Sequence, residues 1–69
     1  MHIKEQILRR IVDNQQYEEI DGVIIDLYSA SAILAVLDAI NETNKAKYLT
    51  KPIHVMADIA FKLLNKVGA

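Results

Sequence analysis

Residues 26–41, DLYSASAILAVLDAIN, constrain the fold of this chain more than any other stretch. On a helical wheel its large apolar residues cover one broad side. Three alanines, Ala32, Ala35 and Ala39, line another side with Tyr28 at its edge. A helix that is apolar around most of its circumference is normally buried between neighbours. The stretch therefore predicts a central helix with the other elements packed around it.

The length of the chain limits what can cover such a helix. Its 69 residues predict one small helical domain, residues 1–69, near the size at which a single core supplies only roughly 3 to 5 kcal/mol. The chain has no cysteines, so disulfides and thiolate metal sites are excluded. Hydrophobic residues make up 52% of it. Self-association is the simplest remaining way to stabilise the domain, and we expect a homodimer or a higher oligomer.

Two further segments have the periodicity of amphipathic helices. In residues 3–14 the apolar side carries Ile3, Ile7, Leu8, Ile11 and Val12, and the polar side includes Glu5 and Arg9. In residues 52–67 the apolar positions are more numerous: Ile53, Val55, Met56, Ile59, Ala60, Leu63, Leu64 and Val67. Both segments are expected to cover the large-residue side of the central helix.

Shorter signals complete the predicted fold. Asp26 stands where a helix N-cap is expected. Residues 42–49 can form a short helix that offers Ala46, Tyr48 and Leu49 to the core, and Pro52 marks the start of the next helix.

Residues 17–25, YEEIDGVII, contain an Asp-Gly pair followed by a β-branched run, and they predict a short β-hairpin. An Asp-Gly pair between two apolar-bearing runs is a strong hairpin signal, because both turn positions tolerate positive φ. The alternative is a helix that ends near Gly22, followed by one extended stretch. An isolated hairpin is marginal in water, so it has to lie on the helices or add to a partner's sheet. The predicted fold class is mainly α, with three main helices, one short helix and this short β-hairpin at residues 17–25.

Charge is distributed unevenly along the chain, although the net charge is only −1. Residues 1–42 hold eight acids against three bases, a net −5, and residues 43–69 hold five lysines against one acid, a net +4. The fold can separate these charges into two faces, bring complementary ends of two copies together, or interleave them.

The lysine-rich region supports one alternative function, a small DNA-binding regulator. Two helices around the turn at residues 50–52 are similar to a helix-turn-helix. The residues that would contact nucleic acid are Lys45, Lys47, Tyr48, Lys51, Lys62 and Lys66. The chain is not basic overall and offers few base-reading side chains, so a protein is favoured over nucleic acid as the partner.

The sequence indicates neither catalysis nor a cofactor. His54 and Asp58 are four residues apart on a predicted helix, but no third ligand or nucleophile accompanies them. No apolar run reaches the roughly 18 residues of a membrane span. The N-terminal sequence MHIKEQILRR places charges where a signal peptide needs an apolar segment. We expect a non-enzymatic, cytoplasmic protein without cofactor, metal or membrane contact.

A resemblance covers somewhat more than half of the chain. Residues 26–62 contain an Asp-x-x-Ser-Ala-x-Ala-Ile opening, a Val-x-Asp-Ala centre and an Asn-x-x-Lys-Tyr link to a helix started by proline. This pattern resembles that of small phage- or prophage-encoded proteins of uncharacterised function, in which threonine stands at the place of Ser29 and an aromatic residue at the place of Leu37. The resemblance implies a phage-type accessory protein in the host cell cytoplasm, and it transfers no catalytic residues.

Together these observations predict a small protein-interaction module that self-associates and binds a host or phage protein. The predicted self-association or partner surface is the small-residue side of the central helix, with Tyr28, Ala32, Ala35 and Ala39. Small side chains there would let another backbone approach closely.

Overall fold

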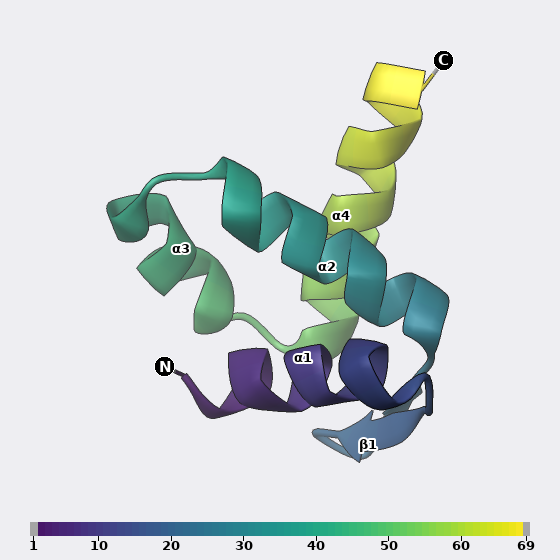
Figure 1. The fold of residues 1–69 in the computed structure, drawn as a ribbon. Helices are drawn as coiled ribbons and strands as arrows, with labels where there is room; N and C mark the ends of the chain where they lie inside the picture. The colour runs from purple at the N-terminus through teal and green to yellow at the C-terminus, as the bar shows by residue number, and fades with distance from the viewer. Residues whose placement is uncertain (1, 69) are drawn as a thin grey trace.

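The structure is a computed structural model, and it describes the backbone of residues 2–68 and the side chains of residues 2–65. Four helices surround one core, and a two-stranded hairpin lies beside the first helix (Figure 1). The predicted mainly α fold with one short hairpin is confirmed. The elements, in chain order, are α1 (Ile3–Asn14), β1 (Glu18–Ile20), β2 (Val23–Ile25), α2 (Leu27–Ala39), α3 (Glu42–Leu49) and α4 (Ile53–Gly68).

Helix α2 is the centre of the fold, as its composition predicts. It packs against α1 on one side and α4 on another. Its residues Ile33 and Leu37 are at most 2% exposed, and they meet Leu8 of α1 and Met56 of α4, which are fully buried, in a single core. Leu27, at the start of α2, is an exception on the predicted apolar side, because it is 40% exposed.

Local capping explains where the helices begin. The Asp26 carboxylate accepts a hydrogen bond from the Ser29 amide at 2.8 Å, which confirms it as the N-cap of α2. Hydrogen bonds from the backbone and the side chain of Ser29 lower the pKa of Asp26. Asn41 caps α3 in the same way through the Asn44 amide, at 2.9 Å. Helix α2 therefore ends before Asn41, two residues earlier than the predicted boundary.

The hairpin forms where the Asp-Gly pair predicts it. Asp21 and Gly22 have φ angles of 53° and 78°, which are the two positive values that a type I′ turn requires. Strand β1 pairs antiparallel with β2, and Ile20 is opposite Val23. The hairpin packs mainly against α1 through β1.

Further side chains differ from their predicted environment. Glu5, assigned to the polar side of α1, is only 3% exposed. Ala46, offered to the core from α3, is exposed, because α3 buries Tyr48 and Leu49 instead. Leu63 and Leu64, assigned to the covered side of α4, are 45% and 38% exposed. The apolar face of α4 continues beyond the part that α2 covers.

Candidate interaction surface

An apolar groove lies between the second half of α2 and the second half of α4. The two helices cross, and their C-terminal ends diverge (Figure 1). Between them is a hollow of about 160 Å³, which we call the α2–α4 groove; it is lined by Ala35, Val36, Ala39, Ile40, Leu63 and Leu64. Neither the hairpin nor α3 contributes to this lining, so both leave the alanine side of α2 open at this end.

An aromatic pair lies on the same two helices. Tyr28 of α2 stacks on Phe61 of α4, with ring centroids 5.6 Å apart and planes 21° from parallel. Tyr28 remains 70% exposed, whereas Phe61 is partly buried against the core. A flat, exposed aromatic ring that is already held by a second ring offers contact area at little cost in side-chain entropy.

The predicted small-residue surface is thus accessible in three of its four residues. Tyr28, Ala35 and Ala39 are exposed. Ala32 is only 4% exposed and belongs to the core, so its assignment to an accessible surface is wrong. The small-residue side of α2 is therefore covered at Ala32 and open further along the helix, where Ala35 and Ala39 line the groove. Sequence periodicity places Ala32 and Ala39 on one side of the helix but does not locate the crossing.

Sequence reasoning missed the two leucines that complete the groove. Leu63 and Leu64 belong to an apolar face that extends over four turns of α4, and we assigned that whole face to the core. The available signal was length, since α2 has 13 residues and crosses a helix of 16. A crossing helix of that length leaves the far turns of α4 uncovered.

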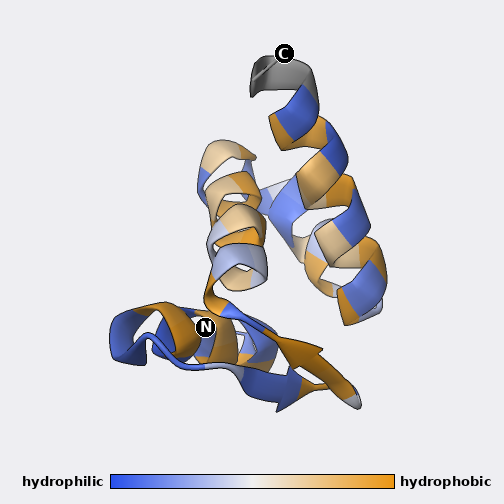
Figure 2. Cartoon of the chain, turned by 90° about the vertical axis from the view of Figure 1, so that its right-hand side faces the viewer, coloured by the Kyte–Doolittle hydropathy of each residue, from blue (hydrophilic) through white to orange (hydrophobic). Residues whose placement is uncertain are grey.

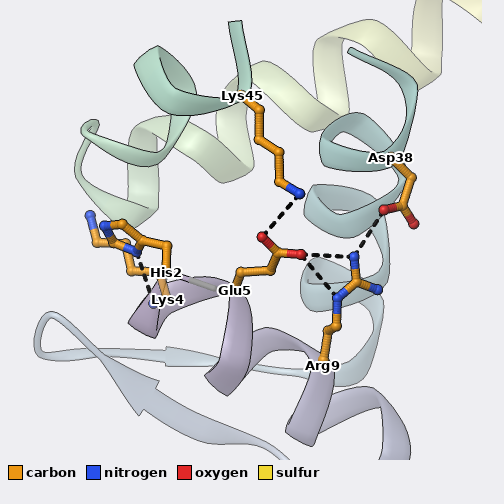
Figure 3. Close-up of polar contacts among 6 residues, drawn as sticks. All are labelled: His2, Lys4, Glu5, Arg9, Asp38 and Lys45. Atoms are coloured by element: carbon orange, nitrogen blue, oxygen red, sulfur yellow. Dashed lines mark hydrogen bonds and ion pairs between the residues drawn. The ribbon is translucent and has the colours of Figure 1, made fainter. Parts of the chain in front are cut away.

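A polar network holds α1, α2 and α3 together (Figure 3). Glu5 Oε2 accepts hydrogen bonds from Arg9 Nε at 3.1 Å and Nη2 at 2.9 Å. Arg9 Nη2 also donates to Asp38 Oδ1 of α2, at 2.9 Å. Lys45 Nζ of α3 lies 3.2 Å from Glu5 Oε1. Each Glu5 oxygen therefore has a cationic partner, which is the condition under which a buried carboxylate stays charged.

Opposing influences set the pKa of Glu5. Burial alone would raise this pKa, but the hydrogen bonds and charges of Arg9 and Lys45 outweigh burial, and the pKa of Glu5 falls below its ordinary value of 4.5. A carboxylate with a lowered pKa in the folded state stabilises the protein fully above the ordinary value. Its contribution is lost as the pH falls through the lowered value.

We therefore predict that acid weakens the fold partly through Glu5. The free energy of unfolding should fall as the pH is lowered from 4.5 into the acid range, and Glu5→Gln should flatten this fall. Urea titrations followed by circular dichroism across that range measure it. The pKa values of Glu18 and Asp26 are also lowered, so some acid sensitivity should remain in the variant. An unchanged acid slope in Glu5→Gln would contradict the role of Glu5.

Two residues of the DNA-binding alternative, Tyr48 and Lys45, have partners within the fold. Tyr48 is 5% exposed, and its hydroxyl donates to the Met56 carbonyl oxygen at 2.5 Å, so it has no face free for a base. Burial raises the pKa of Tyr48 to about 12. Lys45 is engaged by Glu5. Three lysines are exposed, Lys47, Lys51 and Lys62. The side chain of Lys66 lies outside the described residues.

The structure also places the other polar residues that the sequence singles out. His54 and Asp58 are both exposed on α4, and no group of three potential metal ligands occurs among the described residues. A second, open hollow of about 650 Å³ contains Asp26, but that carboxylate is held as a helix cap; the lining is Gln15, Gln16, Tyr17, Asp26 and Leu27.

None of the described helices combines the length and the apolarity that crossing a membrane requires. Comparison of the chain with protein-family models, with curated proteins and with solved structures finds no match.

Proposed function

We propose that this protein is a non-enzymatic interaction module that forms a homodimer through the α2–α4 groove. The groove itself is the observation that carries the proposal, because apolar side chains line it from two helices and no other part of the described chain covers it. In a domain whose core supplies so little stability, covering this surface would add to the fold.

A second copy is the occupant that the shape of the groove favours. A twofold interface brings the same patch of both subunits together, so the patch has to be complementary to itself. The lining of the groove combines the small side chains of Ala35 and Ala39 with the larger, exposed side chains of Leu63 and Leu64. The leucines of one copy can therefore enter the alanine hollow of the other. A net charge of only −1 does little to oppose the association.

The wider role that we propose is that of a phage-type accessory protein in the host cell cytoplasm, where the dimer binds a host or phage protein. Support for this part comes from the sequence pattern of residues 26–62. The alternative of a small DNA-binding regulator has less support, because Tyr48 is buried and Lys45 is paired within the fold.

Ala35→Glu tests the dimer. Size-exclusion chromatography with light scattering at micromolar concentration should show about twice the 7.8 kDa mass for the native protein. The variant should run as a monomer, since a carboxylate buried in an apolar interface without a partner is strongly unfavourable. Ala46→Glu is the matched control, because Ala46 is also an exposed helical alanine but lies on α3, outside the groove.

Two outcomes would contradict the proposal. One is a native protein that stays at 7.8 kDa at the highest concentration measured. The other is an Ala35→Glu variant that keeps both its helical circular dichroism and the native mass. A dimer lost equally in Ala46→Glu would place the interface elsewhere.

A further inference from the structure

Strand β2 has an edge with unsatisfied backbone groups. In a hairpin with a two-residue type I′ turn, the residues that flank the turn exchange hydrogen bonds, and here these are Ile20 and Val23. The next pair, Glu19 and Ile24, is then a non-hydrogen-bonded pair, so the N–H and C=O groups of each point away from the hairpin. Among the described residues, no group outside the strand pair hydrogen-bonds to Ile24.

The hairpin is held firmly enough to serve as a template for another strand. Ile20 and Ile25 are each 3% exposed, so the inner face is anchored in the core. Arg10 forms two hydrogen bonds of 2.6 Å with Glu18 at one end of β1, and Lys4 Nζ lies 3.4 Å from the Asp21 carboxylate at the turn. Adding a strand to this pair would therefore require little ordering of the hairpin.

The two edges differ in their protection. Proteins discourage unwanted strand pairing by placing charged residues on exposed edges. Strand β1 carries Glu18 and Glu19, whereas β2 consists of three β-branched residues without a charge. Figure 2 shows this contrast as a largely hydrophilic strand beside a hydrophobic one. Ile24 is 60% exposed, so the outer face of β2 is apolar as well as unprotected.

The charges around the β2 edge indicate which residues an added strand should carry. No lysine or arginine occurs in residues 11–44, which include the whole hairpin. Glu18 and Asp21 are paired within the fold, but the Glu19 carboxylate is exposed on the same face as Ile24 and has no partner among the described residues. An incoming strand with apolar and basic residues in alternation can cover Ile24 and reach Glu19. A second copy would bring another acidic hairpin instead.

We infer that the β2 edge is a strand-addition site for an extended basic and apolar segment of a partner protein. Such a segment would exchange backbone hydrogen bonds with Ile24 and extend the hairpin to three strands. The site uses none of the residues of the α2–α4 groove. The protein would then offer two separate surfaces, one to its own copy and one to a partner.

The probe is a capped peptide of alternating lysine and valine, with a fully N-methylated version of the same peptide as its control. The N-methylated peptide keeps the charges and side chains but has no amide to donate. We expect the first peptide to shift the Ile24 amide resonance and slow its hydrogen exchange, and the second to bind at least tenfold more weakly. Glu19→Gln should weaken binding of the first peptide a few-fold.

Protein variants test the edge independently. Ile24→Pro removes the outward N–H and should reduce peptide binding at least tenfold, whereas Ile24→Val keeps the N–H and should bind as the native protein does. The Ala35→Glu variant should bind the peptide as the native protein does, so the outcome does not depend on the dimer. Equal binding of both peptides would overturn the inference, since attraction of charges alone would then explain it. Loss of self-association in a folded Ile24→Pro variant would also overturn it, because a second copy would then occupy the edge.

Discussion

Leu37→Ala should bring the domain close to complete unfolding. Leu37 is 2% exposed in the middle of the core, and truncating such a leucine costs about 3 kcal/mol through lost burial and the cavity left behind. A domain of this size has only roughly 3 to 5 kcal/mol in total. Urea unfolding is followed by circular dichroism at one fixed protein concentration. The variant should lose most of the baseline that the folded protein shows at low urea, because much of it should already be unfolded there.

Leu27→Ala is the matched control for this experiment. Leu27 lies in the same helix but is 40% exposed, so its truncation should cost about 1 kcal/mol or less. The sequence pattern assigns both leucines to the apolar side of α2, and only the structure separates them. Equal losses of stability in the two variants would contradict the position of α2 in the core.

The second large effect should come from Arg9→Leu. This change takes two hydrogen bonds from the buried Glu5 carboxylate and leaves only Lys45 to balance its charge. Breaking a fully buried ion pair costs roughly 3 to 5 kcal/mol. Arg9 is itself 37% exposed and Lys45 remains, so we expect a smaller loss of about 2 kcal/mol.

A double variant separates the charge from the packing. Glu5→Leu combined with Arg9→Leu removes the unpaired buried carboxylate and should recover most of the lost stability, because apolar residues often replace a buried pair at little cost. Arg10→Leu is the control on the neighbouring residue. Arg10 also forms two hydrogen bonds to a glutamate, but the pair is open to solvent, and its removal should change stability little. Similar losses in Arg9→Leu and Arg10→Leu would show that the buried network has no special role.

Glu5 and Arg9 also show why the polar network was missed. They are four residues apart, and the sequence predicts an ordinary pair on the surface of an amphipathic helix. The network depends on Lys45, 40 residues further along the chain, and on Asp38 in another helix. Local periodicity does not indicate that α3 will fold back over Glu5. The opposite charges of the two parts of the chain interleave at this point.

The candidate groove was predicted only in part, because the rest of it also depends on contacts between distant segments. The alanines on one side of α2 indicate where another surface can approach, and Ala35 and Ala39 are indeed accessible. The sequence does not place the crossing of α2 and α4, and it does not indicate that Ala32 is buried while Leu63 and Leu64 are exposed. Exposure at a crossing depends on the angle between two helices, and that angle results from packing over the whole core.

The sequence by itself determined the elements of this protein and their order. Positive φ at Asp21 and Gly22 makes the hairpin, and side-chain oxygens at Asp26 and Asn41 cap two helices. Each of these effects acts over a few residues, so it can be read locally. Only the tertiary structure decided which apolar residues remain uncovered and which charges are buried, because both depend on contacts between segments that are distant along the chain.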